Sequence, residues 1–231
     1  TALADLYEEF IPLQDLNEEE LKNLEFLSKA LGRMRVQDVI VPVFREGIKE
    51  DKDRNVRKHS LIGLAMLAGN VQASGQTLSQ PELVGELIDI SKEGDRLLRH
   101  QAAYALGLFP SEKSQQRLVA LLSDPDLMTR TNAAIGLSRN DSAEGIPVFI
   151  ELIRGAKDWD LDPNQVKTEE GKSTYFERML ILINSMKALS QVHEKLSADQ
   201  KQTLTQLLEI LSDQTQDAVL KSQILELKQT L

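Results

Sequence analysis

The sequence contains no cysteine, few aromatic residues and no long apolar run. Phe, Tyr and Trp together make up 4% of its 231 residues. Without cysteine, the chain can form neither disulfides nor zinc–thiolate sites, and it has no thiol nucleophile. No stretch of about 18 consecutive apolar residues occurs, so no transmembrane helix is predicted. Because the apolar residues are mostly Leu, Ile, Val and Ala, helices packed through aliphatic side chains are favoured over an aromatic-rich β-sandwich.

Basic residues are outnumbered by acidic ones. Lys and Arg number 27 against 36 Asp and Glu, which gives a net charge of −9. A surface of this sign repels phosphate groups, so nucleic acid and anionic membranes are disfavoured as partners. The chain begins with Thr1 rather than Met, which is expected if its N-terminus has been trimmed. The compartment therefore stays open, with the cytoplasm favoured.

The residue patterns that commonly mark an enzyme are also missing. The sequence has three histidines, and none belongs to a His-Glu-x-x-His zinc motif. It contains no phosphate-binding loop, dinucleotide-binding glycine loop or nucleophile elbow. We therefore expect a protein that is not an enzyme and has neither a cofactor nor a resident metal.

Three segments of the chain align with one another without gaps. They are VRKHSLIGLAML from Val56, LRHQAAYALGLF from Leu98 and TRTNAAIGLSRN from Thr129. In each segment a small residue follows an arginine by three positions, and a leucine preceded by Gly or Ala comes four positions later. Small residues let neighbouring helices approach closely, and the leucine supplies a buried contact. The segments are therefore predicted to be equivalent helices.

An acidic residue precedes each of these arginines by six positions. The pairs are Asp51 and Arg57, Glu93 and Arg99, and Asp124 and Arg130. An arginine can bind a carboxylate or the carbonyl groups of a turn through parallel hydrogen bonds. We interpret the six residues as a structural ladder that fixes how neighbouring repeats stack, rather than as a reaction site.

An amphipathic stretch lies before each acidic turn and again further along the chain. These stretches read VQDVIVPVFREGI, PELVGELIDI, SQQRLVALL and EGIPVFIELI. The predicted unit is therefore helix, short turn, helix, and neighbouring units must stack to bury their apolar faces. In the last two units, Leu182 and Leu220 stand where the ladder arginine is expected.

Together these features resemble HEAT repeats, in particular the bacterial PBS-lyase HEAT-like variety. Pro42 and Pro147 match the proline found early in the first helix of that pattern, and the acid, the arginine and the Ala/Leu-rich second helix follow in order. The resemblance covers residues 31–155. It implies an all-α fold, an α-α superhelix (a HEAT-like α-solenoid) of about five helix pairs.

The resemblance weakens towards both ends of the chain. Residues 1–30 are expected to form N-terminal capping helices, because Asn17 and Glu20 have the spacing of a capping box. Residues 31–193 are expected to carry the HEAT-like repeats, with an insertion near 155–173. Residues 194–231 are expected to form a divergent helix pair, and all three parts to belong to one solenoid domain.

The insertion contains a run of acids with the spacing of an EF-hand calcium loop. Positions 1, 3, 5 and 12 of such a loop fall on Asp158, Asp160, Asp162 and Glu169. Pro163 stands where that loop needs a glycine, and Gln165 stands where it needs an apolar residue. Calcium is therefore kept as an alternative to a solvated acidic loop.

The HEAT resemblance implies a scaffold or adaptor that binds a protein or peptide on a concave face built from second helices. Candidate contact residues are Arg96, His100 and Tyr104, which are predicted to face solvent on one of those helices. Trp159 in the insertion is a further candidate, because an exposed tryptophan is a common anchor at protein interfaces. The oligomeric state stays open.

Other HEAT-like proteins supply the alternative functions. The bilin lyases share the repeat variety, although the repeat pattern carries no catalytic residue over to this chain. HEAT-like DNA glycosylases need a basic groove lined with aromatics, which an acidic, aromatic-poor chain does not favour. Deoxyhypusine hydroxylase holds a di-iron centre with several His-Glu pairs, and here only His193–Glu194 forms such a pair.

Overall fold

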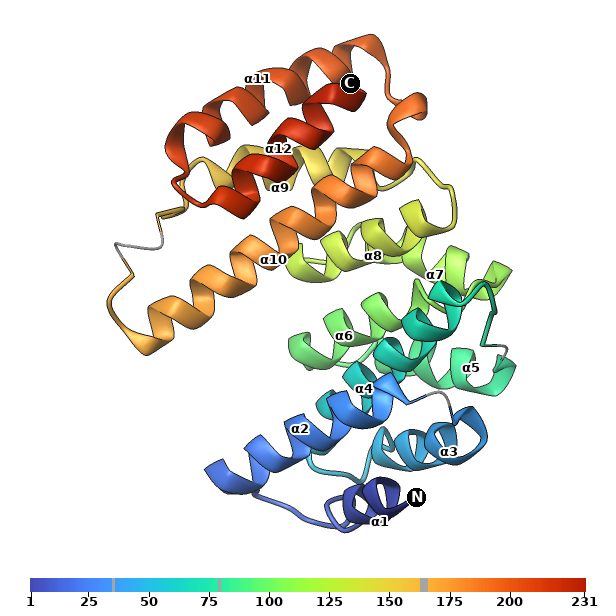
Figure 1. The fold of residues 1–231 in the computed structure, drawn as a ribbon. Coiled ribbons are helices and arrows are strands. Elements are labelled where there is room, and N and C mark those ends of the chain that lie inside the picture. Colours follow the sequence, from blue (N-terminus) through green and yellow to red (C-terminus); the bar gives the residue numbers. More distant parts are fainter. Residues whose placement is uncertain (35, 79, 163–165) are drawn as a thin grey trace. The chain divides into compact units, whose positions relative to one another are not determined.

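The computed structural model describes residues 1–34, 36–78, 80–162 and 166–231, and every regular element in these ranges is helical (Figure 1). The helices are α1 (Ala2–Glu8), α2 (Glu18–Arg33), α3 (Gln37–Gly47), α4 (Arg54–Ala73), α5 (Pro81–Ile90), α6 (Arg96–Leu106), α7 (Glu112–Leu121), α8 (Leu127–Arg139), α9 (Ile146–Ala156), α10 (Glu169–Gln191), α11 (Ala198–Gln214) and α12 (Ala218–Thr230), with a short 3-10 helix at His193–Lys195. In this part of the chain, no helix has both the length and the apolar character needed to cross a bilayer.

The chain divides into two compact units, Thr1–Arg117 and Leu118–Leu231, and the boundary falls within α7. Across the described residues, five consecutive helix pairs follow α1 and α2: α3–α4, α5–α6, α7–α8, α9–α10 and α11–α12. This is the α-solenoid class of helix-hairpin repeats, and the predicted all-α fold is confirmed. The grouping of all pairs into one domain stays a prediction.

In the first unit, helix α2 begins at the predicted capping box. The Asn17 side chain accepts hydrogen bonds from the backbone N–H groups of Glu19 and Glu20, and the Glu20 carboxylate accepts one from the Asn17 N–H at 2.8 Å. The capping box is therefore confirmed. Helix α2 buries one stripe of leucines and packs along α4; the leucines are Leu24, Leu27 and Leu31.

Helix α1 is attached to the first repeat by a buried tyrosine. Tyr7 is fully buried, and its ring meets Phe44 edge-on with 5.2 Å between the ring centroids. The hydroxyl groups of Tyr7 and Ser60 share a hydrogen bond of 2.9 Å. Burial raises the pKa of the Tyr7 phenol above its ordinary value of 10. The ring contact with Phe44 and the hydrogen bond with Ser60 therefore attach α1 to α3 and α4.

Helices α3 and α4 approach closely because small residues stand where they meet. A Cβ atom on Gly63 would lie 2.2 Å from the Phe44 ring, and one on Gly47 would lie 2.1 Å from the Ser60 hydroxyl oxygen. The small residues and leucines aligned in the three repeated segments are all fully buried, as predicted: Ser60, Ala102 and Ala133, and Leu64, Leu106 and Leu137. Pro42 differs from expectation, since α3 extends on both sides of it.

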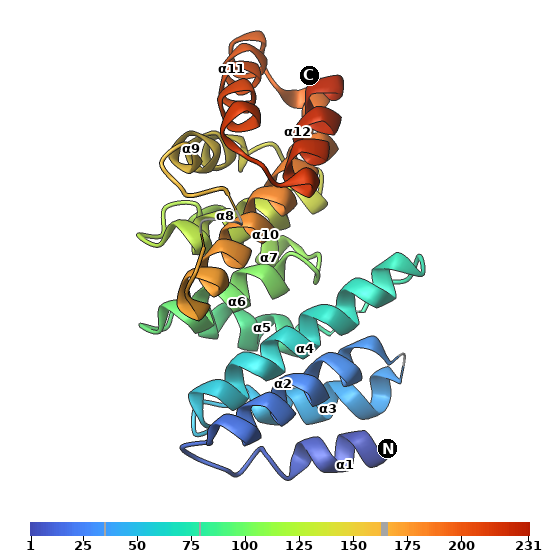
Figure 2. The same cartoon turned by 60° about the vertical axis from the view of Figure 1, so that its left-hand side comes forward.

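In the second unit, α11 and α12 lie side by side, and α12 also packs against α10 (Figures 1 and 2). The core between these helices and α9 is mainly aliphatic. Leu182 and Leu220, which replace the ladder arginine, are both fully buried. At this position the last two helix pairs therefore use an apolar contact in place of a polar one.

A buried histidine in α4 has no hydrogen-bond partner at its Nδ1 among the described residues. His59 is 4% exposed. Burial lowers the pKa of His59 from 6.5 to about 4; the positive charges of Lys58 and Lys29 act in the same direction, while Glu25 opposes them. The imidazole is therefore neutral in the folded protein at pH 7.

We predict that His59 makes the stability of the protein fall between pH 7.5 and pH 5. In this interval the unfolded chain binds a proton at His59 and the folded protein does not, so acid favours unfolding. The contribution should be on the order of 1–2 kcal/mol, and it should be absent in His59→Leu. Urea unfolding at both pH values measures it, with His193→Leu as the control. Equal pH dependence in the parent and His59→Leu would contradict the prediction.

Candidate functional site

The first ladder arginine ties together the turns of two consecutive repeats. Arg57 lies in the first turn of α4 and is 7% exposed. Its Nε donates to the carbonyl oxygen of Ile48 at 3.1 Å, and its two terminal nitrogens donate to the carboxylate of Glu93 at 2.9 and 2.5 Å. Ile48 directly follows α3 as its C-cap, whereas Glu93 follows α5. The Arg57 side chain therefore bonds both to the turn between α3 and α4 and to the turn between α5 and α6.

The other two ladder arginines bind the backbone of the turns that precede them. Arg99 Nη1 donates to the carbonyl oxygens of Glu93 and the following residue, at 3.1 and 2.8 Å. Arg130 Nη1 donates to those of Asp124 and the following residue, at 2.7 and 3.2 Å. In these two repeats, the six-residue spacing thus joins the arginine to the main chain of the acid. The side chain of Glu93 is left to receive Arg57.

Asp51 and Glu151 show that the carboxylate partners do not follow the six-residue spacing. The carboxylate of Asp51 is bound by Lys52 at 3.2 Å, which lowers the pKa of Asp51, and the side chain is exposed. Arg130 donates from Nη2 to Glu151 on α9 at 2.5 Å. The acid six residues before an arginine therefore identifies the turn but not the ion pair.

A second recurrent acid caps the second helices. Asp53, Asp95 and Asp126 each precede a ladder arginine by four residues, and each accepts backbone N–H groups at the start of α4, α6 or α8. Arg54 binds the carboxylate of Asp95 and lowers the pKa of Asp95 to about 2. Sequence reasoning missed this cap, although the aspartate recurs at one position ahead of the aligned segments.

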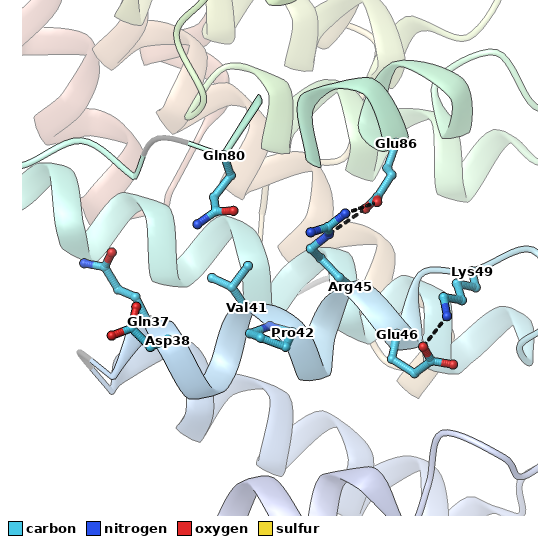
Figure 3. Close-up of a pocket in the computed structure, with 9 residues that line it drawn as sticks. All are labelled: Gln37, Asp38, Val41, Pro42, Arg45, Glu46, Lys49, Gln80 and Glu86. Carbon is cyan, nitrogen blue, oxygen red and sulfur yellow. Dashed lines mark hydrogen bonds and ion pairs between the residues drawn. The ribbon is translucent and has the colours of Figure 1, made fainter. Parts of the chain in front are cut away.

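A further contact joins the first helices α3 and α5. Arg45 donates to Glu86 through Nε at 3.1 Å and through Nη2, and to Glu82 at 3.2 Å. A pocket of about 470 Å³ lies beside this contact, where Arg45 and Glu86 face one another (Figure 3). Its lining residues are Gln37, Asp38, Val41, Pro42, Arg45, Glu46, Lys49, Gln80 and Glu86. Glu46 and Lys49 in the lining also pair with each other, so these two charged groups are already engaged. We therefore interpret the pocket as a gap between two repeats rather than as a ligand site.

The three binding candidates on α6 lie one turn apart. Arg96 is exposed, whereas His100 and Tyr104 are half-buried. Each of the three already has an interaction partner within the protein. A partner at this face would therefore compete with existing contacts, and the role of these residues in binding stays a prediction.

The insertion is shorter than predicted, because α9 continues to Ala156 and α10 begins at Glu169. Trp159 in this loop is half-buried and packs against the core of the second unit. The guanidinium carbon of Arg178 lies 5.2 Å from the centre of the indole ring, within the range of a cation–π contact. The tryptophan is therefore half-buried rather than fully exposed, and its role as a contact residue stays a prediction.

Two hydrogen bonds attach the insertion and α10 to the start of α12. The Thr215 hydroxyl donates to the carbonyl oxygen of Leu161 at 3.2 Å, and Leu161 is 3% exposed. The Tyr175 hydroxyl donates at 2.9 Å to Asp217, which caps α12. Burial and the negative charge of Asp217 raise the pKa of Tyr175. The described part of the loop is therefore built into the unit.

The four acids at the calcium positions do not form a metal site among the described residues. Asp160 accepts the backbone N–H of Asp162 at 3.1 Å, and Glu169 is bound by Lys172 at 2.7 Å. No group of three or more His, Asp and Glu side chains in the described ranges could hold a metal ion. Pro163 and Gln165 lie outside the described residues.

Beside the loop, α10 contributes to a second pocket of about 500 Å³.

Two large apolar side chains stand exposed one turn apart on α10. Phe176 is 66% exposed and Leu180 is 61% exposed. The neighbouring stripe of Tyr175, Met179 and Leu182 is buried. A helix with one buried and one exposed apolar stripe has a second surface available for contact. The apolar residues Phe176 and Leu180 are visible in the sequence. Because each directly follows a buried apolar residue, Tyr175 or Met179, the sequence pattern does not show which of the two stripes is exposed.

The contacts above define a helical repeat protein whose helix pairs are tied through their turns. Residues 84–162 match the family model for HEAT repeats. This confirms the predicted resemblance over that part of the chain, and the PBS-lyase variety is compatible with the match. A search of curated proteins finds no match to the chain.

Solved structures similar to this chain have low sequence identity to it. A designed armadillo repeat protein is 14% identical, with 99% of each chain covered and a TM-score of 0.46. YibA from Escherichia coli is 18% identical, with 98% of this chain and 81% of that chain covered and a TM-score of 0.46. Human deoxyhypusine hydroxylase in complex with glycerol is 12% identical, with coverage of 100% and 85% and a TM-score of 0.38. At these TM-scores the similarities bear no conclusion about function.

We predict that Arg57→Ala lowers the free energy of unfolding by about 1–3 kcal/mol, because it leaves the half-buried Glu93 carboxylate and the Ile48 carbonyl without their donor. A double-mutant cycle with Glu93→Gln, followed by urea unfolding, measures the coupling. Lys22→Ala, which removes an exposed ion pair on α2, serves as the control and should leave the midpoint unchanged. Additive effects of Arg57→Ala and Glu93→Gln would refute the clamp.

Thr215→Val should loosen the insertion by removing the donor to Leu161 while preserving the shape of the side chain. The cost should be about 1 kcal/mol. Trp159, as the only tryptophan, reports the change through stronger acrylamide quenching of its fluorescence. Thr205→Val is the control, since the Thr205 hydroxyl bonds within α11. If both variants quench alike, Thr215 is not the anchor.

Proposed function

We propose that this protein is a non-catalytic scaffold that binds a protein or peptide through exposed faces of its second helices. The observation that carries the proposal is the exposed apolar pair Phe176 and Leu180 on α10. Single exposed apolar residues are common on protein surfaces, but two adjacent large ones form a patch that favours a partner. HEAT-type solenoids typically present such helix faces to other proteins.

The charge distribution supports a protein partner over nucleic acid. Three arginines at the starts of second helices, Arg54, Arg57 and Arg130, each bind a carboxylate of this chain. Their positive charge is therefore largely neutralised, and the chain as a whole carries −9. A phosphate backbone would find little uncompensated positive charge at these three arginines.

The other candidates take a secondary place in this proposal. Arg96, His100 and Tyr104 would contact the partner on α6 after giving up present interactions. Trp159 would contribute only if its cation–π contact with Arg178 opened. Phe176 and Leu180 need no such rearrangement, because their side chains are already exposed.

The test compares affinity capture by the intact protein with capture by Phe176→Ser/Leu180→Ser. We expect captured proteins to fall by about tenfold or more, because an interface loses its apolar anchors. The matched control is Val219→Ser/Leu225→Ser on α12, where the side chains are 63% and 59% exposed. Circular dichroism checks that both variants fold. Equal capture by the two double variants would reject the proposal.

A further inference from the structure

The exposed side of α10 carries a row of residues spaced four, three, four, three and four apart. The row consists of Glu169, Ser173, Phe176, Leu180, Ile183 and Lys187. Alternating steps of three and four keep residues on one side of a helix, which is the spacing of a coiled-coil seam. Ile183 is half-buried and the others are exposed. We call this row the α10 seam; at 1.5 Å per residue it is about 27 Å long.

The α10 seam is symmetric about position 178. Phe176 and Leu180 lie two residues to either side of it, and Glu169 and Lys187 lie nine residues to either side. In an antiparallel pair of α10 helices related by a two-fold axis at this position, each residue therefore meets its counterpart. Apolar centre meets apolar centre, and Glu169 of one copy meets Lys187 of the other at both ends.

The two charged residues of the seam are available for such a contact. Lys187 is exposed and has no ion-pair partner among the described residues. The Glu169 side chain is 89% exposed, and Lys172 binds only one of its oxygens. A parallel pairing would place Glu169 against Glu169 and Lys187 against Lys187, so the charges favour the antiparallel arrangement.

We infer that the partner for the α10 seam is a second copy of this chain, docked antiparallel to form an isologous dimer. The inference rests on the proposed function, because both use Phe176 and Leu180. The net charge of −9 makes two copies repel at long range. Association therefore needs a local surface that is both apolar and complementary in charge, and the α10 seam provides one.

Charge reversal tests the pairing by sedimentation velocity at micromolar concentrations. Lys187→Glu and Glu169→Lys should each raise the dimer Kd by about tenfold or more, because two like-charged contacts replace two attractive ones. The double variant Glu169→Lys/Lys187→Glu should recover dimerisation. An equimolar mixture of the two single variants should form a heterodimer, since every contact is then between opposite charges. Lys221→Glu on α12 is the matched control and should dimerise like the parent.

A parent protein that stays monomeric overturns the inference, as does a dimer that survives both Lys187→Glu and Phe176→Ser/Leu180→Ser. If the parent is monomeric but still captures other proteins through Phe176 and Leu180, the proposed function stands and self-association is rejected. If the dimer and its charge-swap rescue are observed but no other protein is captured, the inference stands and the proposed adaptor role fails.

Discussion

The helix pair α3–α4 is attached to α5–α6 by a guanidinium group that reaches two turns at once. Arg57 can do this because its planar fork offers separate donors to the Ile48 carbonyl and to the Glu93 carboxylate. A lysine would supply a single point charge and would leave one acceptor unbound. In a repeat array each unit contacts only its neighbours. We therefore interpret this contact as one that sets how the two pairs stack, which stays a prediction. A buried charge of this kind is stabilising only while its partner is in place.

Close helix packing and polar contacts at the turns both stabilise the stacked helix pairs. Gly47 and Gly63 let α3 approach α4 where any side chain would clash, and Tyr7 attaches the first helix to the same repeat. At the starts of the second helices, aspartates such as Asp95 supply the caps and also receive charge from the preceding repeat. Within the helix pairs the polar groups of the turns are largely engaged with one another. The exposed apolar stripe of α10 therefore stands out as surface that the fold itself does not use.

The insertion illustrates how a sequence motif can suggest chemistry that the fold does not assemble. Its acids have calcium spacing, yet Asp160 closes a local turn and Glu169 pairs along α10. Its tryptophan suggested an exposed anchor, but the ring lies against the core beside Arg178. Both outcomes have the same cause, because Leu161 is buried and bonded to Thr215, which draws the loop onto its own unit.

The sequence by itself determined the helix pairs, the buried positions of the three repeated segments and the capping of α2. These depend on periodicity and on contacts between residues only a few positions apart, such as Asn17 with Glu20. Only the tertiary structure decided which acid each arginine binds. Arg57 meets Glu93, 36 residues away, rather than the nearby Asp51, and no local pattern encodes that distance. It also decided that Trp159 is half-buried while Phe176 is exposed, because exposure depends on which faces the neighbouring helices occupy.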